Sequence, residues 1–185
     1  MPAQALLTAE ELLRLNLPNK RTELVHGMLI IREPAGYQHG DVAMRLGAAI
    51  HAHVEAHDLG RVFAAETGFM LARKPDTVRA PDVAFISKDG LPDPPLRGFA
   101  EMAPDLTVEV LSPDDDTPEV IEKVADWLRA GARLVWVVDP LRNNARVYRA
   151  DGSEALLGER DALDGEDVLP GFTYAIGALR RRGSA

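Results

Sequence analysis

The chain has 185 residues, of which 46% are hydrophobic and 27% charged, and these ordinary globular values exclude a wholly disordered protein. The absence of cysteine excludes disulfide frameworks, zinc ribbons and thiol catalysis, and it fits a reducing compartment. The formal net charge of −8 disfavours a metal-free nucleic-acid binder, because such proteins normally carry a basic face.

The chain opens with a predicted short helix and a hairpin. Thr8 and Glu11 form a capping box, so a helix is expected to begin there and to run to about Leu15. Residues 23–32 are typical of a hairpin that turns at His26-Gly27. No stretch in the chain approaches the ~18 apolar residues of a membrane span. Because the first residues also lack the features of a secretory signal, we expect a cytoplasmic protein that does not associate with membranes.

The rest of the chain alternates between strand and helix patterns. In chain order we predict a helix over 41–58, strands over 61–65, 69–71 and 83–86, a proline-containing loop over 87–104, a strand over 106–111, a helix over 118–130, and strands over 133–138 and 144–148. The interleaving predicts an α/β fold class with a central mixed β-sheet flanked by helices. The length predicts a single domain over residues 1–185, with the N-terminal helix and hairpin at about 7–32 and a flexible tail at about 178–185.

Negative charge is concentrated in one segment. Between Asp105 and Asp126 the chain has eight acidic residues and a single basic one, Lys123. Such a segment either attracts hard cations or forms a solvated loop. The run Asp114-Asp115-Asp116 lacks the ligand alternation of a calcium site, which favours a solvated loop leading into the next helix.

Two acidic residues stand beside aliphatic strands. Glu109 lies within 106–111, a segment that is aliphatic on both faces, as in a strand that is covered on both sides. A carboxylate there is costly unless it is paired, hydrogen-bonded or bound to a metal; alternatively, it lies at the strand end in water or beside an arginine. Asp82 leads into the strand at 83–86 and could simply fix a turn. If both converge at neighbouring strand ends, they could supply oxygen ligands for Mg²⁺ or Mn²⁺.

Lys123 lies at the edge of the apolar face of the helix at 118–130, whose start is marked by Thr117 and Pro118. It could extend to solvent beside Glu119 or Asp126. Turned inward, it could instead polarise a water molecule or stabilise charge on a phosphate.

These residues occur within a wider pattern, which is formed by the segments Arg79-Ala80-Pro81-Asp82-Val83, 104–113, Lys123 with Trp127, Gly131 and 135–140. The pattern resembles the Uma-two (Uma2) family of bacterial proteins regarded as endonucleases, within the PD-(D/E)xK restriction-endonuclease-like superfamily. The segment 22–27 resembles the early glutamate-containing hairpin of the family, and His39 stands where many members have a histidine. The resemblance covers roughly Leu7 to Ile176.

The resemblance implies a divalent-metal-dependent endonuclease that hydrolyses DNA. Asp82, Glu109 and the backbone carbonyl of Val110 would ligate Mg²⁺ or Mn²⁺, and Lys123 would orient the attacking water. Glu23 would be an auxiliary acid near the metal, or else a surface strand residue. His39 would be a second auxiliary group, or else a helix-start or packing residue. A bound cation would reverse the local field and so allow an acidic protein to handle a polyanion.

Two positions depart from the pattern. The usual superfamily lysine two residues after the glutamate is replaced by Leu111, and in this family the lysine lies on the following helix, at Lys123. Trp127 stands where the family commonly has tyrosine, which indicates a change in packing. The missing lysine keeps open an alternative function, a catalytically inert protein that binds nucleic acid or a protein partner. Hydrolysis of a small phosphoester is a third possibility.

Other candidates are weaker. His53 and His57 have the spacing of a two-histidine metal site, but no third ligand is evident, so packing or an interface is favoured. The resemblance makes a homodimer plausible, and the histidine-bearing helix is its only support in the sequence. The basic residues 180–182 could touch a phosphate backbone or form a solubilising tail.

Overall fold

The computed structural model describes residues 6–15, 17, 18, 20–93, 97–113, 115 and 117–180. In chain order, its helices and strands are α1 (Ala9–Arg14), β1 (Arg21–Val25), β2 (Met28–Arg32), α2 (Tyr37–His57), β3 (Gly60–Ala64), β4 (Phe69–Ala72), β5 (Thr77–Arg79), β6 (Val83–Ser87), the 3-10 helix η1 (Lys88–Gly90), β7 (Leu106–Val110), α3 (Thr117–Arg129), β8 (Leu134–Asp139), β9 (Asn144–Arg149), β10 (Glu154–Leu157), β11 (Ala162–Asp164), β12 (Thr173–Ala175) and the 3-10 helix η2 (Ile176–Leu179).

A six-stranded sheet forms the centre of the molecule, with the strand order β10-β9-β8-β7-β6-β3. The pair β7 and β8 is parallel, whereas the other neighbours are antiparallel, so the sheet is mixed as the sequence predicts. The helix α3 connects the two parallel strands, as a crossover connection must. The α/β fold class with a central mixed sheet flanked by helices is confirmed.

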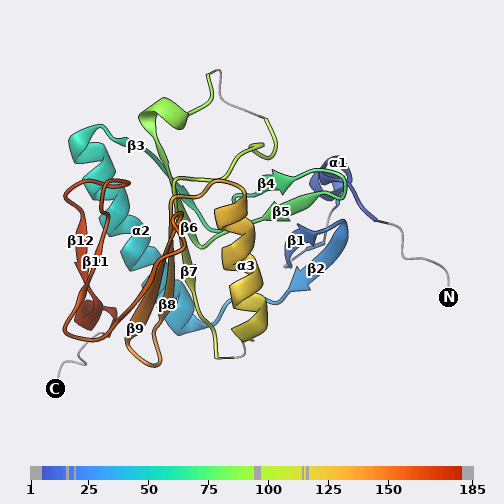
Figure 1. Cartoon of the computed structure of the whole chain (residues 1–185). Coiled ribbons are helices and arrows are strands. Elements are labelled where there is room, and N and C mark those ends of the chain that lie inside the picture. Colours follow the sequence, from blue (N-terminus) through green and yellow to red (C-terminus); the bar gives the residue numbers. More distant parts are fainter. Residues whose placement is uncertain are drawn as a thin grey trace.

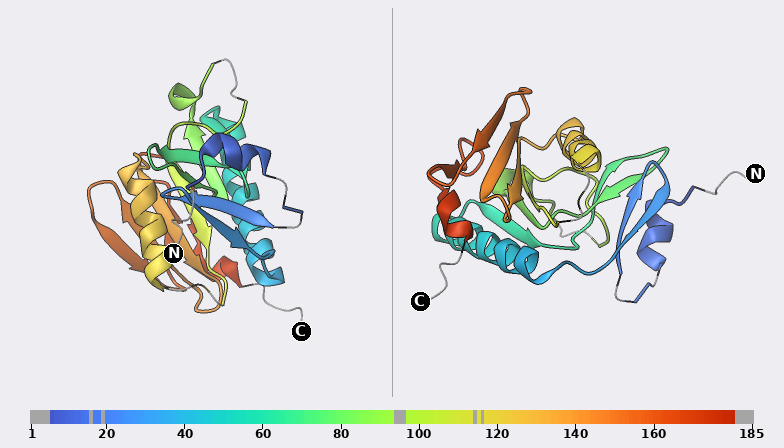
Figure 2. Two further views of the ribbon diagram at one scale, coloured as in Figure 1. Left: turned by 90° about the vertical axis from the view of Figure 1, so that its right-hand side faces the viewer. Right: turned by 90° about the horizontal axis from the view of Figure 1, so that it is seen from below.

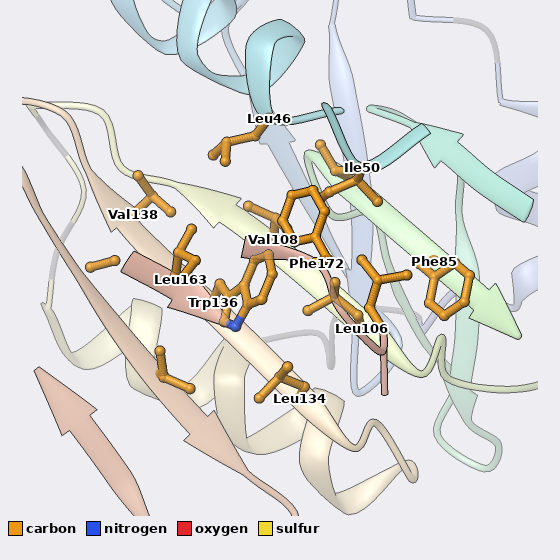
Figure 3. Packing of buried hydrophobic residues seen from close by; sticks show 14 of the residues in the cluster. Leu46, Ile50, Phe85, Leu106, Val108, Leu134, Trp136, Val138, Leu163 and Phe172 are labelled. Atoms are coloured by element: carbon orange, nitrogen blue, oxygen red, sulfur yellow. The ribbon is translucent and has the colours of Figure 1, made fainter. Parts of the chain in front are cut away.

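The two long helices cover opposite faces of this sheet (Figure 1). Alternate side chains of β6 and β7 point to opposite faces, because successive residues of a strand do so. Val83, Phe85 and Val108 pack with α2 in the larger core cluster. Figure 3 shows part of this cluster. Ala84 and Ile86 pack with α3 in a second cluster. All residues of β7 and β8 are buried, which agrees with a strand covered on both sides.

A smaller sheet, of order β2-β1-β5-β4, lies on the side of the large sheet that carries α3 (Figures 1 and 2). The predicted hairpin is present, with His26 and Gly27 both at positive φ in its turn. The capping box is also present: Thr8 Oγ1 accepts from the N–H of Glu11, and Glu11 Oε2 accepts from the N–H of Thr8. The residues of α1 pack onto this sheet through Leu12.

Several predicted boundaries differ from the structure. The helix α2 begins at Tyr37 rather than Asp41, because His39 is the only buried residue of its first turn and so no apolar periodicity marks the start. Thr117, predicted as a cap, is the first residue of α3. In the segment predicted as a flexible tail, Leu179 is instead buried in η2. Residues 181–185 lie outside the described part of the chain.

Candidate active site

A cavity of about 240 Å³ lies between the smaller sheet, α3 and the ends of β6 and β7. Its lining contains every side chain that the sequence and the resemblance single out for the site, namely Glu23, His39, Asp82, Glu109 and Lys123, together with Val110. These residues come from β1, α2, the segment before β6, β7 and α3, so the fold brings together positions that are far apart in the sequence.

Asp82 is held against the end of β7. Its N–H donates to the carbonyl of Val108 at 3.0 Å, and its Oδ2 accepts from the N–H of Val110 at 2.8 Å. Val83, the next residue, pairs with Val108 in the sheet. Asp82 is therefore fixed beside Glu109 by the antiparallel pairing of β6 and β7, and it does not merely shape a turn.

Glu109 is buried and both of its oxygens are hydrogen-bonded. Oε2 accepts from Lys123 Nζ at 2.8 Å, and Oε1 accepts from the indole N–H of Trp127 at 2.8 Å. Burial raises the pKa of Glu109 to about 7, and the nearby Asp82 and Glu23 carboxylates add to the rise, against the lowering effect of Lys123. A carboxylate in this environment favours a compensating cation.

Lys123 turns inward from α3 and lies among carbonyl and carboxylate oxygens. Its ammonium is 2.8 Å from Glu109, 3.1 Å from Glu23 and 3.2 Å from the carbonyl of Ala80. Burial lowers the pKa of Lys123, but the carboxylates of Glu109 and Glu23 outweigh it and raise the pKa above its ordinary value. The side chain is therefore a fixed positive charge in the site at neutral pH.

Glu23 is buried on β1 and is not a surface strand residue. Its Oε1 accepts from the N–H of Ala80 at 2.9 Å, and its Oε2 accepts from Arg79 at 3.1 Å. Burial raises the pKa of Glu23, but Lys123 and Arg79 outweigh this effect and leave the pKa lowered. Glu23 is thus ionised between two cations and ties β1 to the site.

Arg79 forms a second layer behind the cavity. It is 1% exposed, and its guanidinium donates two hydrogen bonds to Asp126 Oδ2, at 2.9 and 2.7 Å, as well as the bond to Glu23. Asp126 lies on the same helix as Lys123. Arg79 therefore connects β5 of the smaller sheet to α3, the helix that also carries Lys123.

His39 lies in the first turn of α2 and faces the cavity. Its Nε2 is 2.9 Å from Asp82 Oδ1, and its Nδ1 is 3.1 Å from the hydroxyl of Ser112. A ring fixed at both nitrogens orients the carboxylate of Asp82. His39 is thus part of the polar cluster, beyond a helix-start position alone.

The donor set suits a hard divalent cation. Within the described part of the chain, no group of three or more His, Asp and Glu side chains is arranged to hold a metal ion. The candidate oxygen donors are instead two carboxylates, Asp82 and Glu109, and the backbone carbonyl of Val110, a residue that also lines the cavity. One or two carboxylates, completed by water and substrate oxygens, are the usual protein contribution to a Mg²⁺ site. The residues present therefore fit Mg²⁺ or Mn²⁺ better than they fit zinc.

Three polar partners in the site were not predicted from the sequence. The sequence indicates only a change in packing at Trp127, yet the indole N–H of Trp127 also donates to Glu109. Its i, i+4 spacing from Lys123 was the signal, because such residues share one face of a helix. Arg79 and Ser112 appeared only within the family pattern, and nothing local in the sequence marks their hydrogen bonds.

The remaining candidates lie elsewhere. His53 Nε2 is 2.9 Å from the carbonyl of Pro170, and its ring packs against His57 and Phe172. This favours packing within the chain, so the homodimer loses its only sequence support and stays a prediction. Asp114 and Asp116 lie outside the described residues, as do Arg181 and Arg182, while the Oδ2 of Asp115 accepts from the N–H of Ser112.

The architecture and the polar cluster together define a restriction-endonuclease-like α/β protein. The pattern of the Uma2 family, described as "Putative restriction endonuclease", matches residues 9–177. This chain therefore belongs to the Uma2 family.

A solved structure supports the same fold. It is the crystal structure of a "putative nuclease belonging to DUF820" from Anabaena variabilis, which superposes with a TM-score of 0.77 at 21% sequence identity over 94% of this chain and 97% of that chain. No curated protein matches the sequence. Within the part of the chain that the structure describes, no helix is both long and apolar enough to cross a bilayer.

Proposed function

We propose that this protein is a cytoplasmic, divalent-metal-dependent endonuclease that hydrolyses phosphodiester bonds of DNA. One observation supports the proposal above all others. Asp82, Glu109 and Lys123 line a single cavity, although three separate segments of the chain carry them. Membership of a family described as "Putative restriction endonuclease" adds to it.

Asp82, Glu109 and the carbonyl of Val110 are the groups that would hold Mg²⁺ or Mn²⁺. When bound, such an ion polarises the scissile phosphate and generates a hydroxide-like nucleophile from water near neutral pH. The residues of the chain prepare the site for it: the N–H of Val110 and the ring of His39 fix the two oxygens of Asp82, and Trp127 fixes one oxygen of Glu109.

Lys123 would act as a hydrogen-bond donor and a fixed positive charge. Because neighbouring carboxylates keep its pKa raised, it cannot serve as a general base at neutral pH. It can orient the attacking water and stabilise the negative charge that develops on the phosphate. Glu23 is an auxiliary acid in this arrangement, since it pairs with Lys123 at 3.1 Å in addition to Glu109.

Purified protein tests the proposal on supercoiled plasmid with Mg²⁺ or Mn²⁺. We expect cleavage that EDTA abolishes, and Glu109→Gln or Asp82→Asn should lower the rate by 10² or more, on the order of the loss of one charge-stabilising group. Asp139→Asn is the matched control, since Asp139 is a buried carboxylate at the end of β8 that lies outside the cavity lining. Undiminished cleavage by folded Glu109→Gln protein would reject the assignment.

The alternative is a catalytically inert protein that binds nucleic acid or a protein partner. Both oxygens of Glu109 already accept hydrogen bonds within the protein, which favours this reading. Calorimetry with Mn²⁺ separates the two. A binding isotherm that disappears in Asp82→Asn supports the enzyme, whereas absence of binding to the wild-type protein favours the inert alternative. Homodimerisation is a separate prediction, and sedimentation equilibrium at micromolar protein concentration tests it.

A further inference from the structure

Two arginines face each other at the open end of the β1–β2 hairpin. Arg21 and Arg32 are direct cross-strand partners, and Lys20 immediately precedes Arg21. Like charges directly opposite each other in an antiparallel pair are destabilising. The hairpin therefore carries an unfavourable concentration of positive charge, in a protein whose formal net charge is −8.

All three of these cations line the cavity that holds Asp82 and Glu109. Arg21 lies two residues before Glu23 on β1, so the two side chains share one face of the strand. The hairpin thus places these cations in the same cavity as the acidic centre.

The present partners of these cations are exchangeable. Lys20 pairs with the side chain of Glu33, which is 78% exposed, and the Nε of Arg21 donates to the backbone carbonyl of Glu33 at 3.2 Å. Exposed ion pairs contribute little to stability, about 0–1 kcal/mol. Bidentate contacts of arginine with phosphate are stronger, so a phosphate can replace these partners at small cost.

The pair Arg32–Glu119 joins the two walls of the cavity. Arg32 belongs to β2 and Glu119 to the first turn of α3, and both line the cavity. Glu119 therefore pairs with the guanidinium of Arg32, which a phosphate in the cavity would otherwise contact. Release of this ion pair frees Arg32 without disturbing the buried network around Glu109.

We propose that Lys20, Arg21 and Arg32 form a phosphate-binding wall, which holds the phosphates that flank the scissile position of a DNA strand, and that Glu119 competes with DNA for Arg32. The inference rests on the proposed endonuclease function and names the residues that would hold the DNA backbone beside the site. A small phosphodiester would reach the acidic centre but would have no neighbouring phosphates for the wall to hold.

Binding of a fluorescent duplex oligonucleotide, measured by anisotropy with Ca²⁺ in place of Mg²⁺, tests the wall. We expect Arg21→Gln and Arg32→Gln each to weaken binding roughly tenfold and to reduce the salt slope by about 1. Arg146→Gln is the matched control, because Arg146 is similarly exposed and pairs with Glu154 at 3.1 Å on β9 and β10, outside the cavity lining. It should change neither quantity.

Glu119→Gln should act in the opposite direction. Because it releases Arg32, we expect tighter DNA binding than Glu66→Gln produces, although Glu66 also lines the cavity and its removal changes the charge equally. The gain should vanish when Arg32→Gln is also present. If the Arg32–Glu119 pair had only a structural role, Arg32→Gln and Glu119→Gln would weaken DNA binding to a similar extent.

Hydrolysis of bis(4-nitrophenyl) phosphate completes the test. Arg21→Gln and Arg32→Gln should raise KM for DNA by a much larger factor than KM for this small diester, and equal losses on both substrates overturn the proposed wall. If wild-type protein cleaves DNA and the hairpin variants match Arg146→Gln, the wall is wrong and the endonuclease proposal stands. If wild-type protein neither binds nor cleaves DNA, both fail together.

Discussion

The ammonium nitrogen of Lys123 lies 2.8 Å from Oε2 of Glu109, although the two residues belong to α3 and β7. In the superfamily pattern, this lysine stands on the same strand as the glutamate, two residues later, where this chain has Leu111. Leu111 also lines the cavity, and residues two apart point to the same side of a strand. The helix α3 thus places the positive charge of Lys123 in the same cavity that Leu111 lines.

Moving the lysine from position 123 to position 111 tests whether its charge can support cleavage from either place. We expect Lys123→Met to lower the rate of plasmid cleavage by roughly 10² or more, because a charge that stabilises the phosphate is lost. The double variant Leu111→Lys/Lys123→Met should recover a measurable part of it. Lys88→Met, at an exposed lysine paired with Asp58, is the control and should be neutral. Full activity in Lys123→Met would remove the lysine from the mechanism.

The sequence predicted the elements that carry strong periodicity or strong caps. The capping box at Thr8, the hairpin turn and the strand β7, aliphatic apart from Thr107 and Glu109, are as predicted, because each is determined by local chemistry. The sequence does not predict the strands β5, β10, β11 and β12. Each has only three or four residues, which is too short for an alternating pattern to be recognised, and tertiary pairing rather than propensity forms them.

The site was predictable only in part. A carboxylate in the aliphatic strand β7 marked Glu109 by itself, whereas the resemblance was needed for Glu23 and His39. Arg79 shows the limit most clearly. Nothing in the local sequence indicates that this arginine is buried, since its partners Glu23 and Asp126 lie 56 and 47 residues away. Contacts of this kind follow from the packing of two sheets and a helix, which no local pattern encodes.

The indole of Trp127 should matter more than its packing alone. Trp127→Phe removes the N–H donor to Glu109 Oε1, which leaves a buried acceptor unsatisfied at a cost of about 1–3 kcal/mol. The control is Trp136→Phe, since Trp136 is equally buried but its indole N–H has no hydrogen-bond partner within the described part of the chain. Denaturant unfolding should show the larger loss for Trp127→Phe, together with weaker Mn²⁺ binding in calorimetry. Equal losses and unchanged Mn²⁺ binding would mean that Trp127 only packs.

The Arg79–Asp126 pair should be among the most sensitive to substitution. Asp126→Asn removes the charge that faces a nearly inaccessible guanidinium, and loss of one partner of a buried pair costs about 3–5 kcal/mol. Glu154→Gln removes the partner of the exposed Arg146 and should cost no more than about 1 kcal/mol. Urea unfolding of both variants against wild type measures the difference. Similar values for the two would show that Arg79 retains enough compensation from Glu23 alone.

Asp76 makes the stability of the fold depend on pH through a carboxylate that does not line the candidate active site. Its carboxylate accepts from the N–H of Ala9 at 2.9 Å and from that of Lys74 at 3.2 Å, and so anchors α1 to the smaller sheet. The hydrogen bond from Ala9 is the main cause of the lowered pKa of Asp76; burial opposes it, and the bond from Lys74 and the charge of Arg73 lower the pKa further. A lowered pKa in the folded state stabilises the fold above the unfolded pKa of about 3.9, and this contribution is lost as the pH falls through the folded value.

Asp76→Asn should therefore be less stable than wild type at pH 7, by about 1–3 kcal/mol for the weakened buried hydrogen bonds, and the difference should shrink below about pH 4. Denaturant unfolding at pH 7 and at pH 3 measures it. The control is Asp93→Asn, at an exposed aspartate outside both core and cavity, which should be neutral at either pH. A difference between Asp76→Asn and wild type that stays constant over this range would show that the charge of Asp76 does not stabilise the attachment of α1.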